Sequence, residues 1–444
     1  MESLLASSGK NSNADAQLQQ AVEFDVRLTT ALLSLGRDVA VGRGDPASLE
    51  PTWKKRRPTP DLPGTLARAL DGGLDQWLDQ VRPTHPEYAA LQQALVATYA
   101  LKDAGGWSEV PLKTLKPSRS DPAVVALRRR LAVSGELAGG STTTESPIYD
   151  DELTRAIRTF QDHHALTATG IADEPTITAM NVPIEARIKQ MAASLERWRW
   201  LPDDFGPRYL LVNVPAYHVI AREHGQTVKD IRVIVGKPDD RTPVFSAQMT
   251  TVIFSPYWRI PDTIAKGETV PAIARNPNYL ATNGIEILRL SKSGATVVNP
   301  STVHWNDPNE VNQLAFRQKP GPKNAMGHVT FLLPNPFEVY LHDTPADALF
   351  AQPGRALSHG CIRVEEPFEL AKYVLQGDPE WDDARIAAAM HAGVEKRVAL
   401  KEEIPVHIVY FTAWVDDQGG LRLYPDIYGY DGTSLETAGP SNGK

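Results

Sequence analysis

The spacing of apolar residues changes near position 207, from a helical period to a strand-like one. Apolar side chains recur at i, i+3, i+7 and i+11 from residue 88, and at i, i+4, i+7, i+11 and i+14 from residue 184, which predicts two amphipathic helices. Beyond 207, runs such as RYLLVNVPAYHVIARE, MTTVIFSPYWRIP and VHIVYFTAWV predict β-strands. The segment DDQGG near the C-terminus is typical of a β-hairpin turn.

These patterns divide the chain into parts that differ in polarity and in the period of their apolar residues. Residues 1–14 are polar and are expected to be disordered. We predict a helical scaffold over 15–117, a bundle of three short helices over 118–182, a linking helix over 183–206, a β-rich domain over 207–432 and a tail over 433–444. A polar, helical insertion at 261–323 is long enough to cover a site. The expected fold class is therefore multidomain α+β.

Composition narrows the function classes. The chain has 444 residues, is 42% hydrophobic and 23% charged, and carries a net charge of −8, which argues against a nucleic-acid binder. No apolar run is long enough to span a membrane, and the N-terminus lacks the basic and apolar regions of an export signal. The single cysteine, Cys361, excludes an intramolecular disulfide.

The run YDDELTRAIRTFQDHHALTATGIADEPTITAMN resembles a peptidoglycan-binding domain of the three-helix type. The resemblance is carried by Phe160-Gln161, Leu166, Gly170, Asp173 and Thr176. Because such a pattern also records the packing of a small bundle, ligand binding by this module stays open.

Candidate chemistry is concentrated in VYLHDTPADALFAQPGRALSHGCIRV, residues 339–364. A thiol needs a base to act as a nucleophile at neutral pH, and His342 precedes Cys361 by nineteen positions. The glycine before the cysteine lets the backbone bend so that N–H groups can form an oxyanion hole.

Three other interpretations of this segment compete. Cys361 could be a buried core residue, but its neighbours are mostly polar. His342, His359 and Cys361 could bind zinc, although no closely spaced Cys pair exists. The pair could also belong to another cysteine peptidase, but papain-like enzymes place the cysteine before the histidine.

The His–Ser-His-Gly-Cys pattern is similar to that of the L,D-transpeptidase catalytic domain of the YkuD type. The segments SPYWRIP, RWRWLP and MGHVTFLLPNPFEVYLHDTP resemble the large periplasmic enzymes of Gram-negative bacteria, in which a capping subdomain is inserted into the catalytic domain. The resemblance implies that Cys361 is the nucleophile and His342 its base. It also implies that the carbonyl of Asp343 orients the imidazole, and that Gly360 and Cys361 provide oxyanion N–H groups.

Further residues are expected to bind the substrate or to support the catalytic motif. The resemblance places Tyr340 and Trp258 in the substrate groove, where core packing is the alternative. Arg363 stands where the family commonly has Asn, and either binds a carboxylate or braces the loop. His359 and Ser358 complete the motif in supporting roles.

The resemblance implies an enzyme that joins donor and acceptor stem peptides of peptidoglycan by 3→3 cross-links through a thioester on Cys361. It implies no metal or other cofactor, acylation by carbapenems, and a location in the periplasm or cell envelope. Two alternatives remain: an L,D-carboxypeptidase that uses water as acceptor, and a non-catalytic peptidoglycan-binding protein.

Overall fold

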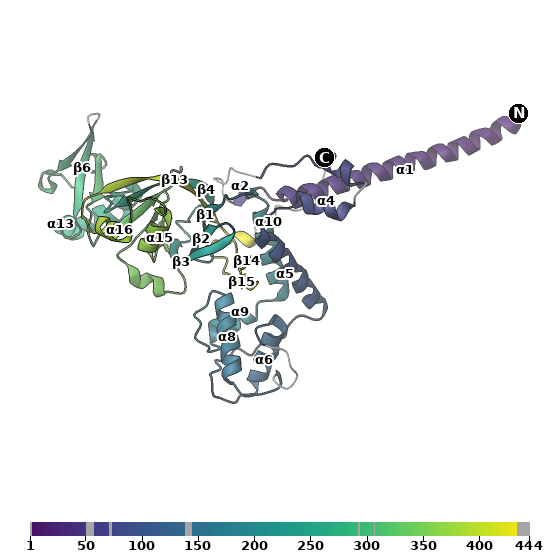
Figure 1. Cartoon of the computed structure of the whole chain (residues 1–444), viewed down its shortest axis with the longest axis horizontal. Coiled ribbons are helices and arrows are strands. Elements are labelled where there is room, and N and C mark those ends of the chain that lie inside the picture. Colours follow the sequence, from purple (N-terminus) through teal and green to yellow (C-terminus); the bar gives the residue numbers. More distant parts are fainter. Residues whose placement is uncertain are drawn as a thin grey trace.

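The computed structural model describes residues 2–49, 57–70, 73–137, 144–291, 294–305 and 307–432. A β-rich body carries a small helical bundle on one side and a long N-terminal helix that projects away from it (Figure 1). Within the described ranges, no helix has the length and apolar character needed to cross a membrane. The predicted tail at 433–444 lies outside the described residues.

The scaffold consists of helices from two separate stretches of sequence. They are α1 (Glu2–Val41), α2 (Pro46–Leu49), α3 (Leu62–Ala69), α4 (Leu74–Val81), α5 (Pro86–Asp103) and α10 (Ile184–Trp198). The predicted disorder of residues 1–14 differs from the structure, because α1 begins at Glu2. No proline interrupts this stretch, so a helix started in the packed part of α1 can extend through it.

The predicted three-helix bundle is confirmed as α6 (Ala123–Ser134), α8 (Asp151–His163) and α9 (Glu174–Met180), with a hydrophobic core of its own. Gln161 holds it together: its side chain donates to Thr176 Oγ1 (2.9 Å) and accepts from the N–H of Gly170 (2.9 Å). The Asp173 carboxylate caps α9 by accepting from the N–H of Thr176. Most of the motif that resembles a peptidoglycan-binding domain is therefore engaged in holding the bundle.

The β-rich domain is a closed barrel. Its strands run in the order β3-β12-β10-β9-β4-β13-β1-β2, and β2 pairs with β3 to close the ring. The bounds are β1 (Arg208–Asn213), β2 (His218–Glu223), β3 (Gln226–Gly236), β4 (Phe245–Phe254), β9 (Val329–Leu332), β10 (Leu341–His342), β12 (Ile362–Val364) and β13 (Lys396–Val409). Alternate residues point into a packed core, as expected of a small barrel.

Short elements surround the barrel. They are η3 (Asp347–Ala351), β11 (Ala356–Ser358), α15 (Pro367–Val374), α16 (Asp383–Met390), β14 (Ala413–Val415) and β15 (Leu421–Leu423). The predicted DDQGG turn joins β14 to β15, which pair antiparallel. The long strand expected from residue 208 is instead two strands, because the chain turns at Tyr217, which has a φ of 58°.

The insertion forms a capping subdomain at the end of the barrel opposite α1 (Figure 1). Its elements are β5 (Trp258–Ile260), α11 (Asp262–Ile264), η1 (Ala265–Thr269), α12 (Val270–Arg275), α13 (Tyr279–Thr282), β6 (Ile285–Ser291), β7 (Gly294–Val298), η2 (Pro300–Thr302), α14 (Pro308–Val311) and β8 (Leu314–Gln318). The strands form a sheet in the order β5-β8-β6-β7 over a separate core. The prediction of a polar, helical insertion missed this sheet, whose strands are short and partly exposed.

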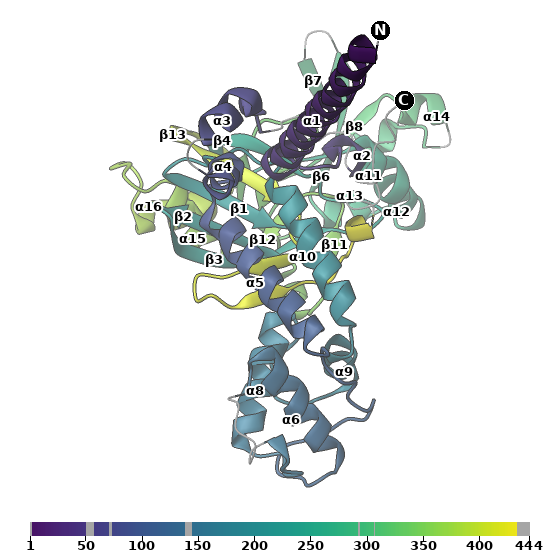
Figure 2. The ribbon, with the colours of Figure 1, turned by 90° about the vertical axis from the view of Figure 1, so that its right-hand side faces the viewer.

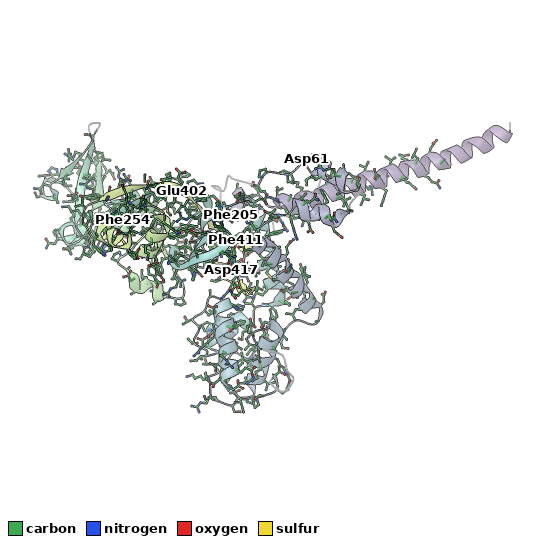
Figure 3. All side chains as sticks on the ribbon, viewed as in Figure 1. Asp61, Phe205, Phe254, Glu402, Phe411 and Asp417 are labelled. Carbon is green, nitrogen blue, oxygen red and sulfur yellow. The ribbon has the colours of Figure 1, made fainter. Side chains whose placement is uncertain are left out.

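Helices α5 and α10 run side by side along the barrel toward the bundle (Figure 2). The Trp198 ring at the end of α10 stacks on Phe411 of the barrel, with 4.5 Å between ring centroids, and on Phe205 at 6.3 Å. Phe205 and Phe411 mark this junction in Figure 3. Scaffold and barrel therefore share one hydrophobic core.

Candidate active site

Parallel strands place the predicted nucleophile and base on one face. Leu341 of β10 lies opposite Ile362 of β12, and both are fully buried in the barrel. His342 lies opposite Arg363, so these two side chains point outward. The N–H of Ile362 donates to the carbonyl of Tyr340, which extends the ladder by one step. By the same alternation, Cys361 shares the outer face with His342 and Arg363.

The imidazole of His342 is held in one orientation. Its Nδ1 lies 2.6 Å from the carbonyl oxygen of Asp343, an acceptor only, so Nδ1 carries the proton. Nε2 is then the atom that can accept a proton. Burial lowers the pKa of His342 to about 4, with the charge of Arg363 acting in the same direction. The ring is therefore a neutral base near pH 7.

Asp343, the residue after the base, is held in place by two backbone N–H groups. The Asp343 carboxylate accepts from the N–H of His328 (2.6 Å) and of Thr344 (2.7 Å). A side chain at Gly327 would place its Cβ 2.3 Å from this carboxylate, and Gly327 has a φ of 60°. Glycine is required here because the carboxylate approaches the backbone so closely.

The thiol of Cys361 is partly exposed and lies 3.6 Å from the carbonyl oxygen of Glu338. Glu338 has a φ of 55°, which is costly for a side chain of this kind. Burial raises the pKa of Cys361, while a backbone hydrogen bond from Tyr340 and the charge of Arg363 oppose that shift. Thiol and imidazole are thus both neutral at rest, so the proton must move as the sulfur attacks.

The turn that carries the thiol is closed by Ser358. Its hydroxyl donates to the carbonyl of Cys361 (2.6 Å) and accepts from the N–H of Gly360 (3.1 Å). The expectation that Gly360 provides an oxyanion N–H does not fit this geometry, because that N–H already has a partner. Within the described part of the chain, the N–H of Cys361 has no such partner and can serve an oxyanion.

Residues far from the motif in sequence also hold the turn that carries the thiol. Thr242, fully buried, donates from Oγ1 to the carbonyl of Gly360 (2.8 Å), and its N–H donates to the Tyr428 hydroxyl (3.1 Å). That hydroxyl in turn donates to the carbonyl of Gly236 (2.6 Å). Sequence reasoning missed Thr242 and Tyr428, because neither stands near the motif and no spacing pattern links them to it.

The remaining predicted residues lie around this centre. Tyr340 is opposite Cys361, and burial, followed by the charges of Glu338 and Cys361, raises its pKa. His359 contacts the capping subdomain, where its Nε2 lies 3.0 Å from Glu268 of η1. Trp258 packs against the core of the capping subdomain, which agrees with the packing alternative.

Arg363 places a positive charge near both His342 and Cys361. Its guanidinium is partly buried, and burial lowers its pKa. In the described ranges it makes no hydrogen bond or ion pair, although it faces the thiol. Such a group is suited to bind an anionic part of a ligand. The same ranges hold no cluster of three metal-binding side chains.

Three stretches of the chain match family models. Residues 207–381 match the family model described as "L,D-transpeptidase catalytic domain", residues 120–180 one described as "Putative peptidoglycan binding domain", and residues 2–95 one described as "Scaffold domain". A curated protein of Haemophilus influenzae named "Putative L,D-transpeptidase" is 32% identical over 248 residues. That match covers 56% of this chain and 49% of the relative, so the chain spans about half the relative's length.

Solved structures of L,D-transpeptidases are also similar. One from Stackebrandtia nassauensis is 12% identical, with a TM-score of 0.25, over 68% of this chain and 97% of that chain. L,D-transpeptidase 3 from Mycobacterium tuberculosis, solved with a faropenem-derived adduct, is 14% identical, with a TM-score of 0.22, over 46% of this chain and 60% of that chain.

The catalytic-domain match includes His342, Cys361 and every strand of the barrel except β13. The helical parts match models of their own, in the order that the fold shows. Residues 207–381 are therefore similar to the YkuD-type L,D-transpeptidase catalytic domain, and residues 120–180 to a peptidoglycan-binding domain.

Proposed function

We propose that the chain forms 3→3 cross-links between peptidoglycan stem peptides, through a thioester on Cys361, in the periplasm or cell envelope. The observation that carries the proposal is the pairing of β10 with β12, which puts a single thiol and a neutral imidazole on one outer face. The Nδ1 contact with Asp343 leaves Nε2 as the proton acceptor.

In the first half-reaction, the sulfur of Cys361 attacks the carbonyl carbon of the third stem residue, a diamino acid, and its proton passes to Nε2 of His342. The oxyanion accepts from the N–H of Cys361. The C–N bond to the terminal D-alanine then breaks, and the imidazolium gives its proton to the leaving amine. A thioester and a neutral imidazole remain.

In the second half-reaction, the side-chain amine of an acceptor stem attacks the thioester carbon and loses a proton to His342. The C–S bond breaks, and the imidazolium returns the proton to the sulfur. One amide replaces another, so no oxidant, metal or nucleotide is consumed. A water molecule at the same position would give hydrolysis, and the capping subdomain supports exclusion of water.

Arg363 supports recognition of the donor. It lies on the outer face, opposite His342 and two residues after Cys361, without a hydrogen-bond or ion-pair partner in the described ranges. We propose that it binds a carboxylate of the stem peptide, which orients the scissile carbonyl over Cys361.

The test is the intact mass of the protein after incubation with a carbapenem, for the wild type and for Cys361→Ala. We expect one covalent adduct on the wild type and none on the variant. Muropeptide analysis after incubation with tetrapeptide-bearing sacculi should then show cross-linked dimers that are absent with Cys361→Ala.

Two results would contradict the proposal. A folded wild type that takes no adduct would favour a non-catalytic wall-binding protein. An adduct accompanied only by shortened stem peptides would show water to be the acceptor, as in an L,D-carboxypeptidase.

A further inference from the structure

A cavity of about 500 Å³ lies between the helical bundle and the barrel, separate from the face of Cys361. Its volume is within the range of small-ligand sites, roughly 300 to 1,000 Å³. Four segments line it: the loop after α8, the strands β1 to β3, the segment after η3, and the β14–β15 hairpin. We call it the interdomain cleft.

The floor of the cleft is one face of three paired strands. Two cross-strand rows form it: Asn213, His218 and Arg232 in one, and Leu211, Ile220 and Asp230 in the other. Each row takes one residue from each strand, so all six point to the same side. The two apolar side chains, Leu211 and Ile220, are therefore neighbours, and the other four can form hydrogen bonds.

The charged side chains of the cleft already have partners. On the floor, His218 Nδ1 lies 2.5 Å from Asp230 Oδ1, and Arg232 Nε lies 2.6 Å from the Glu365 carboxylate. Arg355 donates to the carbonyls of Val233, Gln352 and Tyr217.

The walls are tied by an ion pair between domains. Arg422 of β15 contacts Asp162 of the bundle, and its Nε lies 2.7 Å from Asp416 in the hairpin. This contact links α8 of the bundle to the β14–β15 hairpin. A ligand in the cleft therefore meets fixed polar groups whose charges are balanced, in contrast to Arg363 at the catalytic face.

We propose that the interdomain cleft binds the glycan of peptidoglycan, about one disaccharide in length, jointly through the bundle and the barrel. The balanced charges favour a neutral ligand over a charged stem peptide. A sugar has apolar C–H faces that can contact the partly exposed Ile220, and hydroxyls that pair with both donors and acceptors. This inference rests on the proposed function, because the glycan strand in the cleft carries the stem peptide that enters the catalytic face.

The position of the cleft fits such a role. The segment after η3 forms one of its walls and continues through β11 to Cys361. The Arg232 guanidinium donates to the carbonyl of Phe350, which holds this segment against the barrel (3.3 Å). Arg355, which lines the cleft, precedes Cys361 by only six positions, so a short stretch of chain links the cleft to the catalytic turn.

The test uses the full chain and a neutral tetrasaccharide of N-acetylglucosamine, with binding measured by calorimetry. Thr167→Trp places bulk at an exposed lining residue, and Asp230→Ala removes an acceptor from the floor. Thr159→Trp is the matched control, because Thr159 is exposed on α8 but does not line the cleft. We expect Thr167→Trp to weaken binding about tenfold or more, Asp230→Ala to weaken it less, and Thr159→Trp to leave it unchanged.

Acylation of Cys361 by a carbapenem, which needs no glycan, should proceed at the wild-type rate in all three variants. The cleft proposal is overturned if the wild type does not bind the tetrasaccharide, if Thr167→Trp binds it as well as the control does, or if only a free stem tetrapeptide binds there. A wild type that takes no carbapenem adduct would overturn the proposed function instead, so the two failures are distinguishable.

Discussion

At the scale of single residues, one positive charge acts on both reacting groups. Arg363 favours the thiolate of Cys361 and disfavours the imidazolium of His342, although burial is the larger influence on each pKa. A resting ion pair is therefore not expected. The base works because it is neutral, and its lowered pKa keeps it neutral well into acidic solution.

A pH profile tests this arrangement. Since His342 accepts a proton only when neutral, acylation by a carbapenem should fall as the pH drops through about 4 in the wild type. Arg363→Met removes a repulsive positive charge, so the pKa of His342 should rise and the acidic limb should move to higher pH. The measurement is the acylation rate across pH, followed by intact mass after short exposures.

Arg363→Lys separates charge from geometry. It should keep the acidic limb of the wild type, because the charge remains. It should still raise KM for a stem-peptide donor about tenfold, because the paired N–H groups of the guanidinium are lost. An unshifted acidic limb in Arg363→Met would show that this charge does not influence His342.

At the scale of elements, the capping subdomain meets the catalytic turn through a contact between two side chains. His359 of the turn and Glu268 of η1 are 3.0 Å apart, and their side chains are 39% and 60% exposed. Such an exposed pair contributes less than about 1 kcal/mol to folding. Its position suggests that it holds the subdomain against the turn.

Glu268→Gln should therefore leave the unfolding free energy within about 1 kcal/mol of the wild type. We expect it to raise the share of hydrolysed over cross-linked muropeptides, because water gains access to the thioester. Glu310→Gln is the control: it breaks the contact with His304 (2.7 Å), a His–Glu pair that lies wholly within the capping subdomain. Equal product ratios in both variants would argue against a role for Glu268.

The elements also show how far the sequence could lead. The helices of the bundle were predictable because each has a periodic apolar face. In addition, α8 and α9 each begin at an aspartate cap. Cys361 and His342 were recognisable because their motif is local. The brace from Tyr428 was not, since it depends on a contact between segments far apart in the chain, which no local period encodes. The sheet in the insertion was missed because its strands are short and partly exposed.

At the scale of the whole molecule, the two helical parts relate to the barrel in different ways. The bundle has a core of its own, whereas α5 and α10 contribute to the core of the barrel. Trp198, 1% exposed, lies in that shared core and stacks on Phe411 and Trp414. The scaffold helix is thus a structural part of the catalytic domain, although the bundle separates it from α5 in sequence.

Trp198→Ala should consequently destabilise the barrel and scaffold together, by roughly 3 to 5 kcal/mol, because it leaves a large cavity in their common core. Phe160→Ala, in the separate core of the bundle, should lower the stability of the bundle alone and leave carbapenem acylation of Cys361 intact. Calorimetric unfolding, with acylation measured at each temperature, distinguishes the two. If Trp198→Ala did not change the temperature at which acylation is lost, α10 would be a detachable linker, and the barrel would hold its catalytic face without it.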